Sequence, residues 1–229
     1  MRRMGKSLIA AAAAVLLLSS CTKGGTPQPD AGVGTEADWP TVGGGADEAS
    51  YSRLTQIDSA SIGKLGLAWS LDLPGETTLE ATPIAAGGTI YFPGAHSAVY
   101  AVDGKSGQLL WRFDPQIWKV NPQKMPLNFA ANRGVSYANG KVFVAVFDGR
   151  LVALDAKTGK ALWTAQTLSP SSTQWITGAP LAFKDKVIIG QSGADNGERG
   201  YVTAYDQATG KQAWRFYPVP GSPQENKGD

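Results

Sequence analysis

Cysteine and histidine are almost absent from this 229-residue sequence, and their scarcity excludes several kinds of site. Cys21 is the only cysteine, so the chain has no internal disulfide and no multi-cysteine metal centre. His96 is the only histidine, which argues against a histidine-based zinc site and leaves little room for a Ser-His-Asp triad. Because His96 falls in an expected hairpin loop, we interpret it as an ordinary surface residue.

The sequence also lacks an excess of charge of one sign. It carries 21 Lys and Arg against 19 Asp and Glu, a net charge of +2. Removing residues 1–20 removes three basic and no acidic side chain, so the net charge falls from +2 to −1. No Lys/Arg cluster remains in the rest of the chain, so we expect no nucleic-acid partner.

Long hydrophobic runs are missing except at the start. Residues 1–20 combine a basic beginning with the run LIAAAAAVLLL, which is typical of a secretory signal and too short for a membrane-spanning helix. The following LSSC, residues 18–21, resembles the bacterial lipoprotein signal, which implies cleavage before Cys21 and lipidation of that cysteine. The alternative is a simple signal peptide cut after small residues. Residues 21–38, rich in Gly, Pro, Thr and acidic side chains, are expected to form a flexible tether.

Beyond residue 38 the sequence repeats itself. The strings AVDGKSGQLLW (101–111), ALDAKTGKALW (153–163) and AYDQATGKQAW (204–214) share one pattern. Their tryptophans, Trp111, Trp163 and Trp214, are 52 and 51 residues apart. Such a fixed period indicates a repeat architecture.

Each repeat predicts about four short strands. Alternating apolar residues precede the Asp of the motif, the Thr/Ser-Gly pair predicts a turn, and a second strand carries the Trp. Two more apolar segments lie upstream in every copy. Four strands in ~50 residues are typical of a β-propeller blade, with the Trp as a wedge between blades. We therefore expect an all-β propeller with tryptophan-docking repeats over residues 39–229, as three full blades plus a partial one that ends at Trp69.

The copies differ where each first strand begins. Glu80, Arg133 and Thr177 fall at the same place within one residue. In a propeller, first strands line the central channel, so these three side chains are expected to converge at one rim. Isolated polar groups there need partners. Either an ion pair between Glu80 and Arg133 or a bound polar ligand would supply them.

The third repeat has an unusual hairpin, GQSGADNGERG (190–200), which opens on the same rim. Its Asp195 is a carboxylate of the kind that binds hard cations, although such loops are usually only turns. Two long entry loops, 114–131 and 166–176, bring Trp118 and Trp175 to this rim. We interpret both tryptophans as loop packing rather than as a ligand platform.

These residues together resemble the quinoprotein alcohol dehydrogenases, which use pyrroloquinoline quinone (PQQ). The resemblance runs from about Trp39 to Pro220 and is carried by the following motifs: YSRLTQID (51–58), LGLAW (65–69), EATP (80–83), NRG (132–134), DGRLVALDAKTGK (148–160), TGAP (177–180) and RGYVTAYD with TGK and WRFY (199–217). It implies an eight-bladed propeller with PQQ and a metal ion, calcium or a lanthanide, on its axis.

The resemblance also implies roles for single residues. Glu80, Arg133 and Thr177 would hydrogen-bond PQQ, Ser192, Gly193 and Ala194 would line it, and Asp195 would be a metal ligand. In such enzymes an alcohol is oxidised, and a periplasmic acceptor such as a cytochrome c takes the electrons. No catalytic residue of the family falls within this sequence. The implied location is the periplasm, with a lipid anchor, more naturally in the outer membrane.

The sequence departs from the family in three ways. Leu127 and Asn128 replace adjacent cysteines, Asp195 stands where the family has Glu, and the later blades that carry the remaining metal ligands and the catalytic Asp are not present. We therefore expect a fragment or truncated product of a longer dehydrogenase. Two other classes stay open: a propeller lipoprotein scaffold of the barrel-assembly type, and a paralogue that binds PQQ without catalysis.

Overall fold

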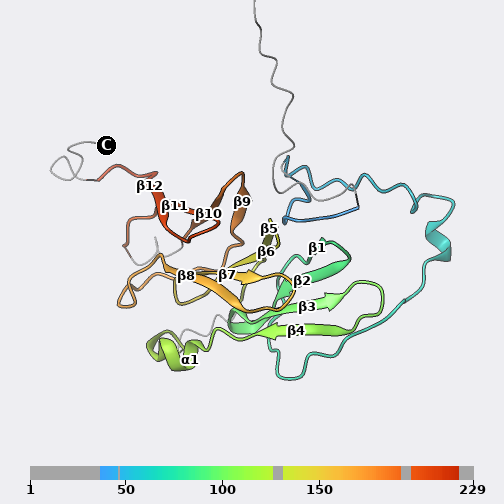
Figure 1. The fold of residues 1–229 in the computed structure, drawn as a ribbon, viewed down its shortest axis with the longest axis horizontal. Coiled ribbons are helices and arrows are strands. Elements are labelled where there is room, and N and C mark those ends of the chain that lie inside the picture. The colour runs from blue at the N-terminus through green and yellow to red at the C-terminus, as the bar shows by residue number, and fades with distance from the viewer. Residues whose placement is uncertain (1–36, 46, 126–130, 192–196, 222–229) are drawn as a thin grey trace, which may run out of the picture.

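The computed structural model describes residues 37–45, 47–125, 131–191 and 197–221. Twelve strands form three antiparallel sheets, each with its four strands hydrogen-bonded in chain order (Figure 1). The first sheet contains β1 (Ile84–Ala86), β2 (Thr89–Pro93), β3 (Val99–Asp103) and β4 (Leu109–Phe113). The second contains β5 (Ser136–Ala138), β6 (Lys141–Ala145), β7 (Arg150–Asp155) and β8 (Ala161–Gln166). The third contains β9 (Leu181–Phe183), β10 (Lys186–Gly190), β11 (Val202–Asp206) and β12 (Gln212–Phe216). Each sheet is one propeller blade, which confirms the predicted fold class.

In the described residues, helical structure is confined to short segments, one before β1 and the others between strands. The α-helix α1 spans Ile117–Val120, and the 3-10 turns are η1 (Ile62–Lys64), η2 (Ala95–Ser97) and η3 (Pro122–Lys124). Within the described ranges, no helix has the length and apolar character needed to cross a bilayer.

The three repeats fold identically around the Asp of the motif. The Asp155 carboxylate accepts hydrogen bonds from the Thr158 hydroxyl (2.8 Å) and from the Thr158 and Lys157 amides (2.8 and 3.1 Å). The hydroxyl of Thr158 is the largest of the causes that lower the pKa of Asp155. Asp103 and Asp206 repeat these contacts with Ser106 and Thr209 and likewise have lowered pKa values.

Tryptophan side chains close the seams between neighbouring sheets. The Trp111 indole of β4 donates to the carbonyl of Ala156 (3.0 Å) in the turn of the second sheet. Its ring covers Gly159, which has a φ of +69°, and a Cβ added at Gly159 would lie 2.6 Å from that ring. Trp163 packs in the same way on the turn of the third sheet, donating to Gln207 (3.0 Å) over Gly210. The predicted wedge role is confirmed for Trp111 and Trp163, whereas Trp214 in β12 is 44% exposed and its wedge role stays a prediction.

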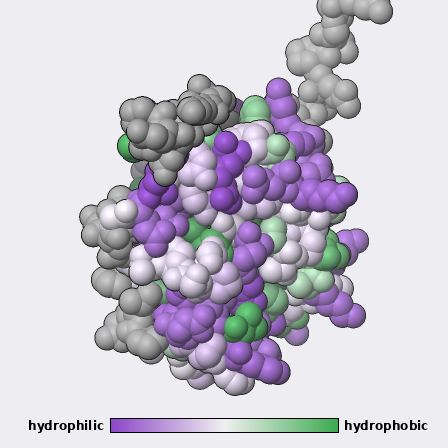
Figure 2. All heavy atoms as spheres, turned by 90° about the vertical axis from the view of Figure 1, so that its left-hand side faces the viewer, coloured by the Kyte–Doolittle hydropathy of each residue, from purple (hydrophilic) through white to green (hydrophobic). Residues whose placement is uncertain are grey.

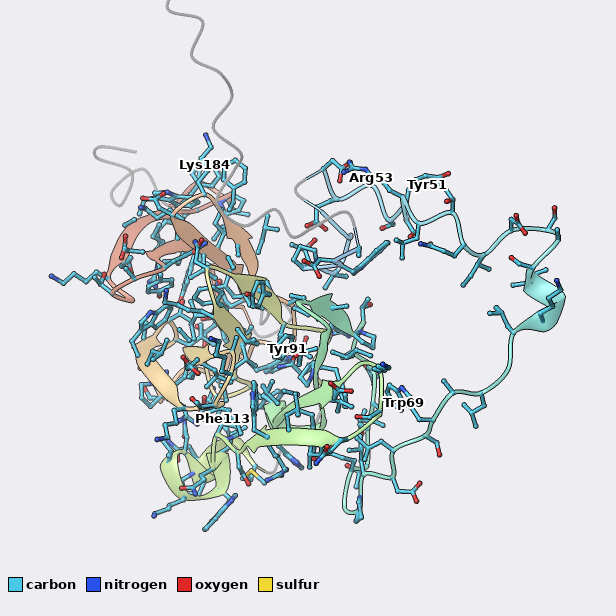
Figure 3. All side chains as sticks on the ribbon, turned by 45° about the vertical axis from the view of Figure 1, so that its right-hand side comes forward. Tyr51, Arg53, Trp69, Tyr91, Phe113 and Lys184 are labelled. Atoms are coloured by element: carbon cyan, nitrogen blue, oxygen red, sulfur yellow. The ribbon has the colours of Figure 1, made fainter. Side chains whose placement is uncertain are left out.

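Trp69 makes the same contact without belonging to a strand. Its indole donates to the Gly104 carbonyl (3.1 Å) and its ring covers Gly107, beside the first sheet in Figure 3. Between residues 47 and 83, all of which are described, no strand is formed. The seam is therefore present where the partial fourth blade was expected, and the blade itself stays a prediction.

Apolar side chains fill the spaces between the sheets. One buried cluster lies between the first and second sheets around Tyr91, which Figure 3 shows in the interior, together with Val99, Val144 and Val152. A second cluster around Phe143 fills the space between the second and third sheets. The side of the molecule that carries β8, β12 and α1 is mostly hydrophilic (Figure 2).

The inner strands of the three sheets approach one another. β1 contacts β5, and β5 contacts β9, so the three first strands lie nearest the centre (Figure 1). Residues 39 and 40 bridge β1 and β5, because Trp39 pairs with Ala85 and the Pro40 carbonyl accepts from the Tyr137 amide (3.0 Å). This arrangement places the segments that enter the first strands side by side.

Candidate functional site

Backbone hydrogen bonds connect the segments that lead into β1, β5 and β9. The Thr82 amide donates to the Arg133 carbonyl (3.2 Å), and the Arg133 amide donates to the Thr177 carbonyl (2.8 Å). Gly134 follows in this row: a Cβ there would lie 2.9 Å from Val42 Cγ2 and 3.1 Å from Ala179 Cβ. The close approach explains why a residue without a side chain is needed at position 134.

Two of the predicted site residues are in direct contact. The Arg133 guanidinium donates a hydrogen bond to the Thr177 hydroxyl, and the Arg133 side chain remains exposed. Glu80 is also exposed and lies two residues before Thr82, on the neighbouring entry segment. Within the described part of the chain, Glu80 forms no ion pair with Arg133, so that alternative is not what holds the guanidinium in place.

The loops between the second and third strands lie on the same rim as these entry segments. The buried Asn132 amide group donates to the hydroxyl of Ser97 (3.0 Å), the last residue of η2, and to the Ala145 carbonyl (2.8 Å). Its oxygen accepts from the Gly134 amide (3.1 Å), and Ser97 also accepts from the Phe147 amide (3.1 Å). Asn132 therefore fixes the backbone on both sides of Arg133.

Asn132 was quoted in the NRG motif, but no role was predicted for it. A polar residue that precedes an apolar inner strand is a usable signal, yet its partners Ser97 and Ala145 are 35 and 13 residues away. The sequence pattern does not name such partners.

The two entry loops differ: Trp175 packs as predicted, whereas Trp118 is exposed and does not take the predicted packing role. Trp175 stacks on Phe147 with 6.3 Å between ring centroids and an interplanar angle of 16°. Trp118 in α1 is 60% exposed. His96 is exposed in the hairpin between β2 and β3, as predicted.

The described structure reaches only the base of the unusual hairpin in the third sheet. There the Gln191 side chain donates to the Arg199 carbonyl (3.4 Å) and accepts from the Tyr201 amide (3.2 Å). The following residues named above lie outside the described residues, and their roles stay predictions: Cys21, Leu127, Asn128, Ser192, Gly193, Ala194 and Asp195. Among the residues that the structure does describe, no group of three His, Cys, Asp or Glu side chains could hold a metal ion.

Sequence relatives match this arrangement over most of the chain. Quinohemoprotein alcohol dehydrogenase ADH IIB of Pseudomonas putida is 50% identical over 186 residues, which cover 81% of this chain and 27% of the relative. The quinohemoprotein alcohol dehydrogenase of Comamonas testosteroni is 47% identical over 189 residues. The chain thus spans about a quarter of the length of these curated relatives.

Solved structures agree in fold. The crystal structure of the Comamonas testosteroni enzyme superposes with a TM-score of 0.75 at 45% identity, covering 82% of this chain and 28% of that one. A europium-containing methanol dehydrogenase superposes with a TM-score of 0.71 at 36% identity, covering 80% of this chain and 32% of that one.

A family model described as "PQQ: Glucose/ethanol/alcohol dehydrogenase, beta-propeller domain" matches residues 39–229. The match covers all three sheets, the Trp-docked seams and the rim that carries Arg133 and Thr177. The chain belongs to the β-propeller domain family of the PQQ-dependent alcohol dehydrogenases.

Proposed function

We propose that this chain forms part of the PQQ-binding propeller of a metal-dependent dehydrogenase that oxidises alcohols. The observation that carries the proposal is the pairing of Arg133 with Thr177 on the rim where three inner strands meet. It is supported by the family to which the chain belongs and by relatives named as alcohol dehydrogenases.

The donor set of this rim suits the proposed cofactor. PQQ carries carboxylates and quinone carbonyls, which need hydrogen-bond donors. An exposed guanidinium is the natural partner of a carboxylate through a bidentate fork, and the Thr177 hydroxyl adds a donor beside it. Gly178 leaves its backbone open, with nothing within 4 Å of an added Cβ. The residues present therefore fit the group.

The role of the protein is to bind and orient. Arg133 would hold a carboxylate of PQQ, and Thr177 would donate to a neighbouring oxygen of the cofactor. Glu80, on the adjacent entry segment, would accept a hydrogen bond from a protonated group of PQQ. When bound, PQQ supplies the two-electron redox chemistry by which the alcohol is oxidised. We assign no catalytic base within this chain.

Residues 192–195 are proposed to complete the PQQ and metal site. Ser192, Gly193 and Ala194 would line PQQ, and Asp195 would contribute to a site for calcium or a lanthanide. A ligand one methylene shorter than Glu shifts the metal position by ~1 Å or more.

We further propose that the protein is exported to the periplasm and anchored by lipid at Cys21, with a cytochrome c as electron acceptor. A relative named 1-butanol dehydrogenase (cytochrome c) from Thauera butanivorans, 42% identical over 187 residues, supports that acceptor class. Labelling of cells with radioactive palmitate tests the anchor: the wild type should be labelled and Cys21→Ala should not. Labelling of Cys21→Ala would contradict it.

PQQ titration tests the binding proposal. Quenching of tryptophan fluorescence by PQQ, with and without calcium, gives the Kd of the purified protein. Losing a charge-assisted hydrogen bond costs about 1.5–3 kcal/mol, so Arg133→Met should weaken binding roughly 10- to 100-fold. Arg53→Met is the matched control, because Arg53 lies on the segment away from the sheets in Figure 3 and its ion pair among the described residues is with Asp47 (3.4 Å).

The outcomes separate the functional classes. Equal affinity in Arg133→Met and the wild type, or no binding by the wild type, would overturn the proposed site, and the latter would favour a scaffold. Binding of PQQ without reduction of a dye by an alcohol would favour a protein that binds PQQ without catalysis.

A further inference from the structure

A buried lysine lies next to the proposed site and takes no part in it. Lys124 is the last residue of η3 and is only 3% exposed. Its ammonium group donates to the carbonyls of Ser172 and Gln174, the latter at 2.6 Å. These acceptors are 48 and 50 residues away, on the loop that enters the third sheet. Lys124 therefore ties the entry loop of the second sheet to that of the third.

A carboxylate binds the same loop. Glu198, at the base of the third sheet's hairpin, accepts from the Thr173 amide (2.9 Å), the Thr173 hydroxyl (2.6 Å) and the Ser172 hydroxyl (3.1 Å). The Gln174 side chain adds a bond to the Arg199 carbonyl (3.4 Å). Residues 172–174 are thus bound by both a cation, Lys124, and an anion, Glu198.

The opposite charges of Lys124 and Glu198 stabilise each other. Burial lowers the pKa of Lys124, and the negative charges of Glu198 and Asp148 act in the opposite direction. The Thr173 hydroxyl is the largest cause of the lowered pKa of Glu198, and the positive charge of Lys124 contributes to the same shift. A buried ammonium group is costly unless it is paired and hydrogen-bonded. The loop carbonyls supply those hydrogen bonds.

The clamped residues lead directly into the rim. Ile176 is buried and its amide donates to the Phe147 carbonyl (3.4 Å), and Trp175 stacks on the Phe147 ring. The next residue is Thr177, which accepts from both the backbone and the side chain of Arg133. Because every step from residue 172 to 177 is anchored, moving residues 172–174 moves the Thr177 end of that pair.

We propose that Lys124 and Glu198 are positioning residues that fix Thr177 against Arg133. The consequence for PQQ affinity rests on the proposed function, whereas the effect on the Arg133–Thr177 pair does not. Neither residue needs to touch the cofactor. Their effect is to hold a guanidinium and a hydroxyl at the spacing that one ligand requires, because small misplacements of such groups weaken binding.

Two readouts on the same variants test this role. Hydrogen exchange without PQQ should show faster exchange of the Thr173 and Arg133 amides in Lys124→Met, by about 10-fold or more, because their acceptors become mobile. PQQ titration of Lys124→Met should give about 10-fold weaker binding. Lys124→Arg, which keeps the charge, should recover part of both. Lys119→Met on α1 is the matched control, since Lys119 is exposed and five residues away.

Glu198→Gln provides an independent variant if Lys124→Met fails to fold. It keeps one acceptor oxygen but loses the charge, so both readouts should change by a smaller factor of about 3. Unchanged exchange at Arg133 in the variants that fold would overturn the positioning role. Faster exchange with wild-type PQQ affinity would overturn the consequence for PQQ binding, because the pair would then be loosened without effect on the cofactor. A wild type that binds no PQQ would instead overturn the proposed function, and exchange alone would then decide whether Lys124 fixes the Arg133–Thr177 pair.

Discussion

The seams between the sheets and the rim at their entrances differ in how far the repeats are alike: the seams repeat one contact, whereas the rim carries a different side chain in each repeat. At the seams, three tryptophans make one contact three times: an indole donates to a turn carbonyl and covers a glycine of positive φ. At the rim, equivalent positions carry different side chains, and only Arg133 and Thr177 pair. Repetition therefore reports architecture, and departure from repetition marks the surface that is free to bind a ligand.

Removing a seam tryptophan gives the largest expected effect. Truncation of a fully buried aromatic side chain costs about 3–5 kcal/mol, so Trp111→Ala, at a partly buried ring, should lower the free energy of unfolding by about 3 kcal/mol. Trp69→Ala should cost less, because Trp69 packs on its turn without belonging to a strand. Urea denaturation measures both. Trp118→Ala, at a 60% exposed residue, is the control and should change stability by less than about 0.5 kcal/mol. Equal losses of unfolding free energy in all three variants would mean that the seam tryptophans contribute no more to stability than an exposed one.

A glycine pair separates ring packing from backbone strain. Gly159 and Gly140 have φ values of +69° and +72°, but only Gly159 faces a ring, with an added Cβ 2.6 Å from Trp111 and nothing within 4 Å at Gly140. Gly140→Ala should cost about 1–2 kcal/mol for the left-handed backbone alone. Gly159→Ala should cost about 1–3 kcal/mol more, because the ring must move. Equal losses of unfolding free energy in Gly140→Ala and Gly159→Ala would mean that the Trp111 ring can move aside at no cost.

At the rim, stability and binding should separate. Asn132→Ala leaves buried partners unsatisfied and should cost about 1–3 kcal/mol of stability while also weakening PQQ binding. Arg133→Met, at an exposed side chain, should leave stability within about 0.5 kcal/mol and affect binding alone. Thermal melts beside PQQ titrations of both variants check this. Matching stability losses would contradict the division between a supporting layer and a ligand-facing layer.

Acid should weaken the seam turns slightly. The folded pKa of Asp155 lies below its ordinary value of 3.8, chiefly because the Thr158 hydroxyl donates to the ionised form. A depressed carboxyl pKa stabilises the fold above the unfolded pKa, and this contribution is lost as the pH falls through the folded value. The urea midpoint should therefore drop below pH about 4, and Asp155→Asn should flatten that drop. Identical pH curves for the two proteins would argue against the turn as its source.

The sequence predicted the sheets and seams well because their determinants are local. The turn Asp, its Thr or Ser three residues on, the Gly and the Trp all lie within eleven residues of one another. Convergence of the entry segments followed from the propeller geometry, and the structure places Arg133 and Thr177 in contact.

The supporting contacts escaped prediction because they join distant segments. Lys124 binds carbonyls about fifty residues away, and Asn132 and Ser97 are 35 residues apart. The buried ion pair of Asp148 with Arg150 (2.8 Å) lies within the quoted motif DGRLVALDAKTGK (148–160), but no pairing was predicted for either residue. Backbone carbonyls as acceptors leave no trace in the side-chain pattern.

The direction of the docking has a consequence for how the protein is made. Each indole precedes in the chain the carbonyl that receives it, by 35, 45 and 44 residues for Trp69, Trp111 and Trp163. Because the N-terminal side of the chain emerges first, from the ribosome and from an export channel alike, each of these rings is available before the turn that it covers. The sheets can thus fold one after another from the N-terminal side, because each tryptophan is present before the turn on which it packs.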